Sequence, residues 1–327
     1  MDTQEIEIRS DPLTKFQSVF NPALKDKKSI LFPDTDENYL DQVIRDSMDN
    51  CFLCQERWQE KTPSYPYEFI PGGKLVNHDV VLFPNLFPLA AYHAVVMVGQ
   101  KHYRPLNDFP VSLLHDAFRV SLEFIRRCFD ADPQVKYFTI NANYLFPAGA
   151  SLIHPHIQIL GGPFPTTHHE LLLRESKTYF ETNNTCYWKD LVEIEKRLGE
   201  RWVAEIGKSN WLAAYAPAGP NEVQVIWPET HHFLQWGEEE IHAVAKGLSK
   251  TLCSYHEMKR STFNFSCFSG ALDGSDDTFR CMLRVINRQN VTPHYRTDGY
   301  YYQKLLGSEI MIEPPEELAL LMRQYFR

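Results

Sequence analysis

Hydrophobic and polar side chains alternate in the segment SLIHPHIQIL, residues 151–160. Because the side chains of a β-strand point to opposite faces with a period of two, this pattern predicts a strand over 151–160. His154, His156 and Gln158 share one face of that strand. The isoleucines between them face the other way, where we expect them to join a hydrophobic core.

The same patterns along the rest of the first half predict mixed helices and strands. Residues 1–50 are polar and are expected to form an irregular arm. Strands are expected where apolar runs are bounded by turn residues, and a helix where apolar residues recur every three or four positions. The predicted elements are a helix near 36–48, two strands within 78–99, a helix over 110–129, a strand over 137–146, a PAGA turn and the strand over 151–160.

A similar order of predicted elements recurs, with weak sequence similarity, in the second half of the chain. Residues 211–236 resemble the hairpin at 81–106, 238–258 resemble the helix, and 263–288 resemble the strand–turn–strand. The step from His102 to His154 is 52 residues, and that from His231 to Cys281 is 50. We therefore predict an α+β fold of two copies of one unit, residues 1–165 and 166–327, each an antiparallel sheet flanked by helices.

The second copy has lost the His-x-His pattern. A segment of loops and helices over 163–210 is expected to join the copies, and a tail helix over 314–326 to close the chain. Chance similarity between two α+β halves is the alternative explanation of the recurrence.

Composition narrows the functional classes. The 327 residues contain 33 Lys and Arg against 42 Asp and Glu, a formal net charge of −9. This balance argues against a nucleic-acid or membrane-surface binder, which needs a basic field. The polar start MDTQEIEIRSD, the lack of long apolar runs and the scattered seven cysteines predict a reduced, cytoplasmic protein with no signal peptide or membrane span.

One cysteine pair has chelating spacing. Cys51 and Cys54 are three residues apart, so both thiolates can reach one Zn²⁺ ion, which prefers four nitrogen or sulfur ligands. No second CxxC exists, so the remaining ligands must be histidines, for which His102 and His154 are the candidates. Two reduced cysteines that cap a turn are the alternative; a redox pair is disfavoured because no thioredoxin-like βαβ pattern surrounds it.

His156 is the candidate nucleophile. If His154 binds a metal, its imidazole is fixed, and His156 lies two residues further along the same face with one nitrogen free. A neutral imidazole attacks phosphorus well and leaves well, which suits a covalent nucleotidyl intermediate. Gln158, Ser151 and the Gly149 turn offer uncharged donors to a transferring phosphoryl group. The alternative is a polar strand face that binds water.

These residues resemble a known family. GASLIHPHIQ is similar to the signature of the galactose-1-phosphate uridylyltransferases, a branch of the histidine-triad superfamily. CFLC stands where that family has its zinc CxxC. The stretch VVLFPNLFPLAAYHAVVMVGQKH resembles its strand–NxFP–strand–His segment, and DPLT resembles its N-terminal NPLT. The resemblance is strong over 51–160 and weak beyond 165.

The resemblance implies two histidine-triad-like units, the second degenerate, in a homodimer. It implies that zinc is bound by Cys51, Cys54, His102 and His154. It implies that His156 carries the nucleotidyl group, that Gln158 and Ser151 stabilise the phosphate, and that Asn85 and Asn141 or Asn143 hold the nucleotide. The implied reaction is ping-pong: a nucleotide sugar gives its NMP to His156, and a sugar phosphate or phosphate takes it.

The chain departs from the family pattern at three places. Lys25, Lys27 and Lys28 stand where the family has an Arg-rich run, and lysine lacks the bidentate fork of arginine. The histidines of a second metal site fall at RCMLRV, so we predict no iron. Glu309 matches a hydroxyl-reading glutamate, but Ser308 replaces its neighbouring tyrosine, so galactose specificity is not inferred.

Three functions follow as hypotheses. The first is a nucleotidyltransferase similar to UDP-hexose:hexose-1-phosphate uridylyltransferases. The second is a phosphorylase of ADP-glucose or of dinucleotides, with phosphate as the acceptor. The third is a zinc-containing nucleotide-binding protein without turnover. The pairs His168-His169 and His231-His232 are interpreted as polar surface residues on loops.

Overall fold

A computed structural model describes residues 5–294 and 299–327 of the chain. Its largest feature is an antiparallel ten-stranded sheet, in the order β3-β4-β5-β7-β6-β11-β12-β10-β9-β8. The strands are β3 (Leu75–Asn77), β4 (Val80–Pro84), β5 (Tyr92–Val98), β6 (Tyr137–Tyr144), β7 (His156–Gly162), β8 (Trp202–Ile206), β9 (Ser209–Ala213), β10 (Val223–Ile226), β11 (Phe263–Phe268) and β12 (Met282–Asn287).

The sheet is built from two similar halves that meet at its centre. β6 and β11 pair there, with Asn141 opposite Ser266. On one side the order continues β7, β5, β4, and on the other it continues β12, β10, β9. We call residues of β3 to β7 with their helix unit one, and those of β8 to β12 with their helix unit two. This arrangement is the predicted α+β fold of two units; the boundary at residues 165 and 166 stays a prediction.

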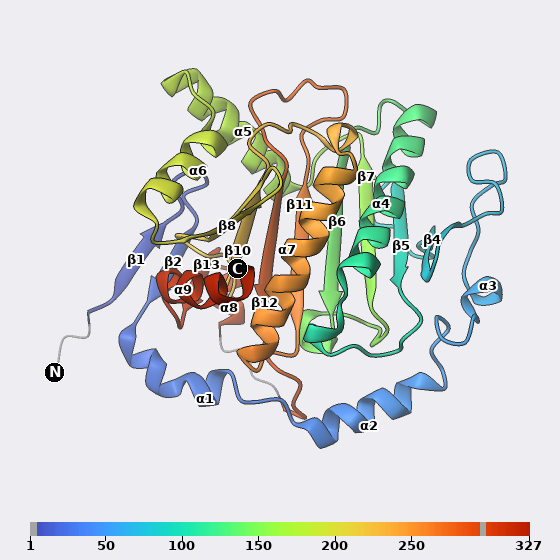
Figure 1. Ribbon diagram of the computed structural model, residues 1–327, viewed down its shortest axis with the longest axis horizontal. Coiled ribbons are helices and arrows are strands. Elements are labelled where there is room, and N and C mark those ends of the chain that lie inside the picture. The colour runs from blue at the N-terminus through green and yellow to red at the C-terminus, as the bar shows by residue number, and fades with distance from the viewer. Residues whose placement is uncertain (1–4, 295–298) are drawn as a thin grey trace.

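Two long helices cover one face of the sheet. Figure 1 shows α4 (Val111–Ala131) and α7 (Glu238–Glu257) side by side in front of the strands, one for each unit. Their apolar faces and the alternate strand residues facing them form the main hydrophobic core. Gly247 of α7 lets the helix approach the sheet, because a Cβ there would lie 1.9 Å from the Trp211 ring.

The opposite face is covered differently in the two units. Over unit two, α5 (Thr167–Asn183) and α6 (Tyr187–Leu198) pack on the sheet through a second apolar cluster that includes Leu172, Trp188 and Phe279. Over unit one, the loop with Cys51 and Cys54 packs on β4 and β5. The polar side chains of β7 therefore lie on a face that no long helix covers.

A small sheet joins the two ends of the chain. β1 (Glu7–Ser10) pairs with β2 (Gln17–Phe20), and β2 pairs in parallel with β13 (Ser308–Met311). Arg9 and Arg201 both bond Glu316 of α9 (Pro315–Phe326), which holds this sheet against unit two. The remaining helices are α1 (Lys28–Leu31), α2 (Glu37–Met48), α3 (Trp58–Lys61) and α8 (Tyr300–Lys304).

Most predicted elements are present, with two differences. The strand predicted over 151–160 begins at His156, because Ser151–Pro155 form bends and turns between η3 (Phe146–Ala148) and β7. The arm at 1–50 is not irregular throughout, because its residues 17–20 pair with residues 308–311, some 290 positions away. Within the ranges described, no helix has the length and apolarity needed to cross a membrane.

Candidate active site

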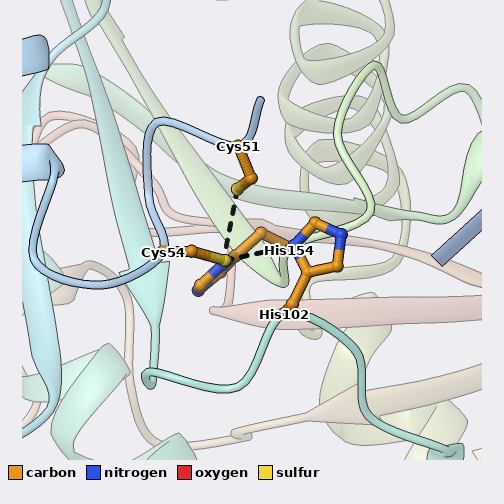
Figure 2. Close-up of side chains that lie close together, drawn as sticks. All are labelled: Cys51, Cys54, His102 and His154. Carbon is orange, nitrogen blue, oxygen red and sulfur yellow. Dashed lines mark hydrogen bonds between the residues drawn. The ribbon is translucent and has the colours of Figure 1, made fainter. Parts of the chain in front are cut away.

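Four side chains converge at one end of unit one. Figure 2 shows Cys51 and Cys54 on the loop after α2, His102 on the segment after β5, and His154 just before β7, all pointing toward one another. The Cys54 Sγ lies 3.2 Å from the Nδ1 of His102 and 3.4 Å from that of His154. All four side chains are buried, and their donor atoms lie within 4.8 Å of one another.

These separations fit a tetrahedral ion. With metal–sulfur bonds of about 2.3 Å and metal–nitrogen bonds of about 2.0 Å, ligand atoms around zinc lie roughly 3.3 to 3.8 Å apart. The Cys51 Sγ to His154 Nδ1 distance, 3.7 Å, and the Cys54 Sγ to His154 Nδ1 distance lie in this range, and the Cys54 Sγ to His102 Nδ1 distance lies about 0.1 Å below it. The cluster could therefore hold a metal ion, and its Cys₂His₂ donor set is one that zinc prefers.

Hydrogen bonds fix both histidines in the form that a metal needs. The His154 Nε2 lies 2.8 Å from the carbonyl oxygen of Gly99, to which it can only donate. The His102 Nε2 lies 2.9 Å from the Ser47 hydroxyl, which donates its own proton to the Val43 carbonyl at 2.7 Å. Both rings therefore carry their proton on Nε2 and leave the Nδ1 lone pair for an ion.

Burial decides the protonation of the cluster in the absence of a cation. Desolvation lowers the pKa of His154 to about 4, so its imidazole is neutral at pH 7. Burial and the neighbouring Cys51 raise the pKa of the Cys54 thiol to about 12. A bound cation reverses this effect on the thiol, because it stabilises the thiolate directly.

His156 begins β7 and has its own fixed tautomer. Its Nδ1 lies 3.0 Å from the carbonyl oxygen of His154, to which it donates. The side chain is 8% exposed, and burial lowers its pKa, so the ring is neutral and the lone pair is on Nε2. His156 also lines a cavity of about 580 Å³. A nucleophilic nitrogen is thus available at the edge of a space that can take a ligand.

Three other predicted residues line this cavity with His156. They are Gln158 on β7, Ser151 in the bend before it and Asn85 after β4. The walls are largely apolar. They come from the loop with Cys51 and Cys54 and from residues 83–89, with Leu152 and Val95 beside them. The cavity thus combines a nucleophile and uncharged donors with an apolar surface of the kind that receives a planar ring.

Comparison with known proteins adds to this geometry. No family model matches the chain. An uncharacterized protein of Archaeoglobus fulgidus is 32% identical over 320 residues, which are 98% of this chain and 92% of that protein. The galactose-1-phosphate uridylyltransferase of Thermotoga maritima is 27% identical over 173 residues, which cover 52% of this chain and 53% of that protein.

The fold also resembles that of known proteins, and this likeness extends over the full length of the chain. An ADP-glucose phosphorylase from Arabidopsis thaliana with bound ADP-glucose superposes with a TM-score of 0.74 and 20% identity, covering 98% of this chain and 99% of that one. Over its whole length the chain therefore has the fold of this phosphorylase, and over half of its length it resembles a galactose-1-phosphate uridylyltransferase in sequence. The resemblance inferred from the sequence motifs is thereby confirmed.

Not every residue that the family resemblance implied lies in the His156 cavity. Asn143, Gly149 and Glu309 line a different cavity of about 660 Å³. The turn at 147–151 borders both spaces, since Gly149 lines one and Ser151 the other. Asn141 lines neither; its amide donates to Thr139 and to the Gln158 carbonyl. The predicted substrate-binding set is therefore divided between two cavities.

The second cavity has its own polar character. Arg288 and Lys304 line it, and neither forms an ion pair with a described residue. Glu309 is 3% exposed and accepts from both Gln303 and the backbone N–H of Ile310. Burial, the larger effect, raises the pKa of this carboxyl group. Cations beside a carboxylate and amides suit a ligand with both a phosphate and hydroxyl groups.

Sequence patterns missed several residues of the first cavity. Lys61 lines it and is the one cationic side chain among its described lining residues. Leu86, Phe87 and Leu89, at its edge, are 67, 79 and 81% exposed. The sequence NLFPL, residues 85–89, predicts a turn between two strands. It becomes a wall of the cavity because the loop with Cys51 and Cys54 packs against β4 beside it.

One prediction about other side chains is wrong, one is confirmed in part, and two cannot be assessed. His168 and His169 lie in α5, not in a loop, and His169 is buried with its Nε2 bonded to the Ser269 carbonyl. His231 and His232 lie in a loop, as predicted, and are half-buried, with the His231 Nδ1 accepting from Arg280. Lys25 pairs with Glu317 at the surface. The side chains of Lys27 and Lys28 lie outside the described residues.

Proposed function

We propose that the protein is a nucleotidyltransferase that carries an NMP group on His156. The observation that supports this best is the His156 ring, whose Nδ1–H is held by the His154 carbonyl while Nε2 is free beside a cavity. A neutral imidazole with one nitrogen fixed is suited to in-line attack on phosphorus.

In the first half-reaction, the Nε2 lone pair of His156 attacks the α-phosphorus of a nucleotide sugar. A P–N bond forms and the bond from the α-phosphorus to the bridging oxygen breaks, so that sugar 1-phosphate leaves. The imidazole gains positive charge, which its Nδ1–H shares with the His154 carbonyl at 3.0 Å. Donors from Gln158, Ser151 and Asn85 are placed along the cavity to receive charge on the phosphoryl oxygens.

The second half-reaction reverses the bond changes. An acceptor oxygen attacks the phosphorus, the P–N bond breaks, and His156 returns to its neutral form. We propose a sugar phosphate as the acceptor, with Glu309 as a hydroxyl reader and Arg288 as a phosphate ligand, because the second cavity combines both kinds of group. Asn143 and Gly149 belong to the same cavity.

The metal cluster has a structural part in this proposal. The donor set fits Zn²⁺, held by Cys51, Cys54, His102 and His154. Bound zinc would cross-link the Cys loop to the start of β7. That link fixes His154, whose backbone carbonyl orients the His156 ring.

The test uses nucleotide sugars labelled at the α-phosphorus, UDP-glucose and ADP-glucose first. We expect an acid-labile, base-stable label on the wild-type protein, none on His156→Gly, and full labelling of the control His242→Ala, which changes an exposed histidine of α7. Discharge of the label by hexose 1-phosphate supports the transferase. Discharge by inorganic phosphate alone would instead indicate a phosphorylase, and no label from any nucleotide sugar would indicate a binding protein.

A further inference from the structure

His93 of β5 lies in the first cavity without a role in the scheme above. It is 5% exposed and lines the cavity with His156 and Gln158. Its side chain points to the same face of the sheet as theirs, because His93 pairs with Leu160 of β7 and Gln158 lies two residues from Leu160 along that strand. Both of its ring nitrogens have protein partners.

The backbone determines which nitrogen of His93 carries the proton. The N–H of Leu89 lies 3.1 Å from Nδ1, and a backbone N–H can only donate. Nδ1 is therefore the acceptor, and a neutral ring must carry its proton on Nε2. Burial, the larger effect, lowers the pKa of His93, in agreement with a neutral ring.

The tautomer of His93 in turn orients the amide of Gln158. The His93 Nε2 lies 2.8 Å from the Gln158 Oε1 and donates to it. The amide oxygen of Gln158 is thus occupied, and its NH₂ group is left for the cavity. If the amide were turned around, two N–H donors would face each other.

Asn85 is oriented in the same sense by a different contact. Its Oδ1 accepts the N–H of Phe87 at 2.9 Å, so its NH₂ is also the free end. That nitrogen also lies 3.1 Å from the His93 Nε2. Two uncharged amides therefore present donors on the side where an anionic group is expected.

We propose that His93 is a positioning residue that sets the Gln158 amide with its nitrogen toward the transferring phosphoryl group. The chain of contacts is Leu89 N–H to His93 Nδ1, then His93 Nε2–H to Gln158 Oε1. This role rests on the proposed function. A free glutamine side chain presents its oxygen about as readily as its nitrogen, and an oxygen would repel the phosphoryl group.

The test is a double-mutant cycle on the rate of label transfer to His156. We expect His93→Phe, which keeps a ring but removes both nitrogens, to slow labelling by roughly 10- to 100-fold, close to the loss in Gln158→Ala. The double variant His93→Phe/Gln158→Ala should be no slower than Gln158→Ala, since His93 acts only through that amide. His242→Phe is the control.

Separate outcomes distinguish the two proposals. Losses that add in the double variant, or a His93→Phe rate within twofold of wild type, overturn the positioning role while leaving the nucleotidyl-histidine intact. A wild-type protein that takes no label overturns the proposed function, and the positioning role falls with it. Imidazole ¹⁵N shifts of the wild type, assigned with His93→Phe, should report the Nε2–H tautomer; an Nδ1–H tautomer would also overturn the role.

Discussion

The two units hold different chemistry on one backbone frame. In unit one the N–H of Val98 bonds the Pro155 carbonyl at 2.9 Å, and in unit two the N–H of Trp227 bonds the Cys281 carbonyl at 3.0 Å. This register makes Arg280 the counterpart of His154. The His154 ring reaches the Gly99 carbonyl at 2.8 Å, and the Arg280 Nε reaches the equivalent Pro228 carbonyl at 2.6 Å.

The counterpart of the metal cluster is filled by a side chain. The Arg280 guanidinium lies 3.1 Å from the Nδ1 of His231, which occupies the place of His102 by the same register. It also donates to the carbonyls of Asp277 and Phe279. A guanidinium donates hydrogen bonds and does not bind metal ions. In unit two, hydrogen bonds from Arg280 therefore occupy the place that the metal-binding lone pairs occupy in unit one.

The strand that follows shows the same contrast. Arg284 stands at the position of Gln158 and Glu222 at that of His93, and the two form a buried bidentate ion pair. Met282 stands at the position of His156. In unit two these polar side chains form an ion pair with each other, whereas the corresponding side chains of unit one line a cavity. The two units therefore share one fold but differ in which polar groups remain available to a ligand.

Loss of the metal is the largest change expected from breaking this contrast. Cys54→Ser should lower bound zinc from about one ion per chain to near zero, because a neutral hydroxyl replaces a thiolate. With free zinc at about 1,000 times Kd, the variant should lose about 4 kcal/mol of stability. Elemental analysis and thermal unfolding measure both.

The controls for this prediction lie outside the cluster. Cys253→Ser changes a half-buried cysteine of α7 and should keep its zinc. His231→Ala in unit two should also leave zinc content unchanged, since its neighbour is a guanidinium. Zinc retained by Cys54→Ser, or lost from His231→Ala, would contradict the assignment of the site to unit one.

Breaking the ion pair of unit two should have an effect on stability of similar size, without loss of zinc. Glu222→Gln leaves the 13%-exposed Arg284 side chain with an uncompensated charge and should lower the free energy of unfolding by about 3–5 kcal/mol. Urea denaturation measures the loss. Lys136→Ala, which breaks a partly exposed pair with Asp273, should cost less than about 1 kcal/mol. Equal losses of unfolding free energy in the two variants would show that burial does not make the Arg284–Glu222 ion pair more important for stability than a partly exposed pair.

Buried histidine in the second half should make stability depend on pH. Burial lowers the pKa of His169 to about 4, whereas an unfolded histidine titrates near 6.5. Between these values the unfolded chain binds more protons, so stability falls as pH drops from about 6.5 toward 4, by up to about 3 kcal/mol. His169→Gln, which can still donate to the Ser269 carbonyl, should flatten this slope in denaturation series, and His242→Gln should not.

The smallest effect sharpens the tautomer argument at the metal cluster. Ser47→Ala removes the acceptor of the His102 Nε2–H and should weaken zinc binding by roughly 10-fold. Competition with a chelating dye measures the affinity. Ser254→Ala, a buried helix serine bonded only to its own helix, is the matched control and should leave the affinity unchanged. An unaltered affinity in Ser47→Ala would remove Ser47 from the site.

Sequence patterns predicted most of unit one and less of what surrounds it. The spacing of Cys51 and Cys54 and the alternation at 151–160 identified three cluster residues, because chelation and strand faces are local properties, and His102 entered as a further histidine candidate and through the family resemblance. The strand beginning was placed five residues early, since the proline and backbone bends before His156 are compatible with the same alternation. The pairing of β2 with β13 could not be predicted, because it joins segments that share no local pattern.

By itself, the sequence determined the residue types on each strand face, the two-unit plan and the acidic character of the chain. The tertiary structure alone decided which of those residues share a space. It separated Asn143, Gly149 and Glu309 from His156, added Lys61 and His93 to the His156 cavity, and filled the second unit with ion pairs. Periodicity fixes which way a side chain points, but only the packing of distant segments fixes what it meets there.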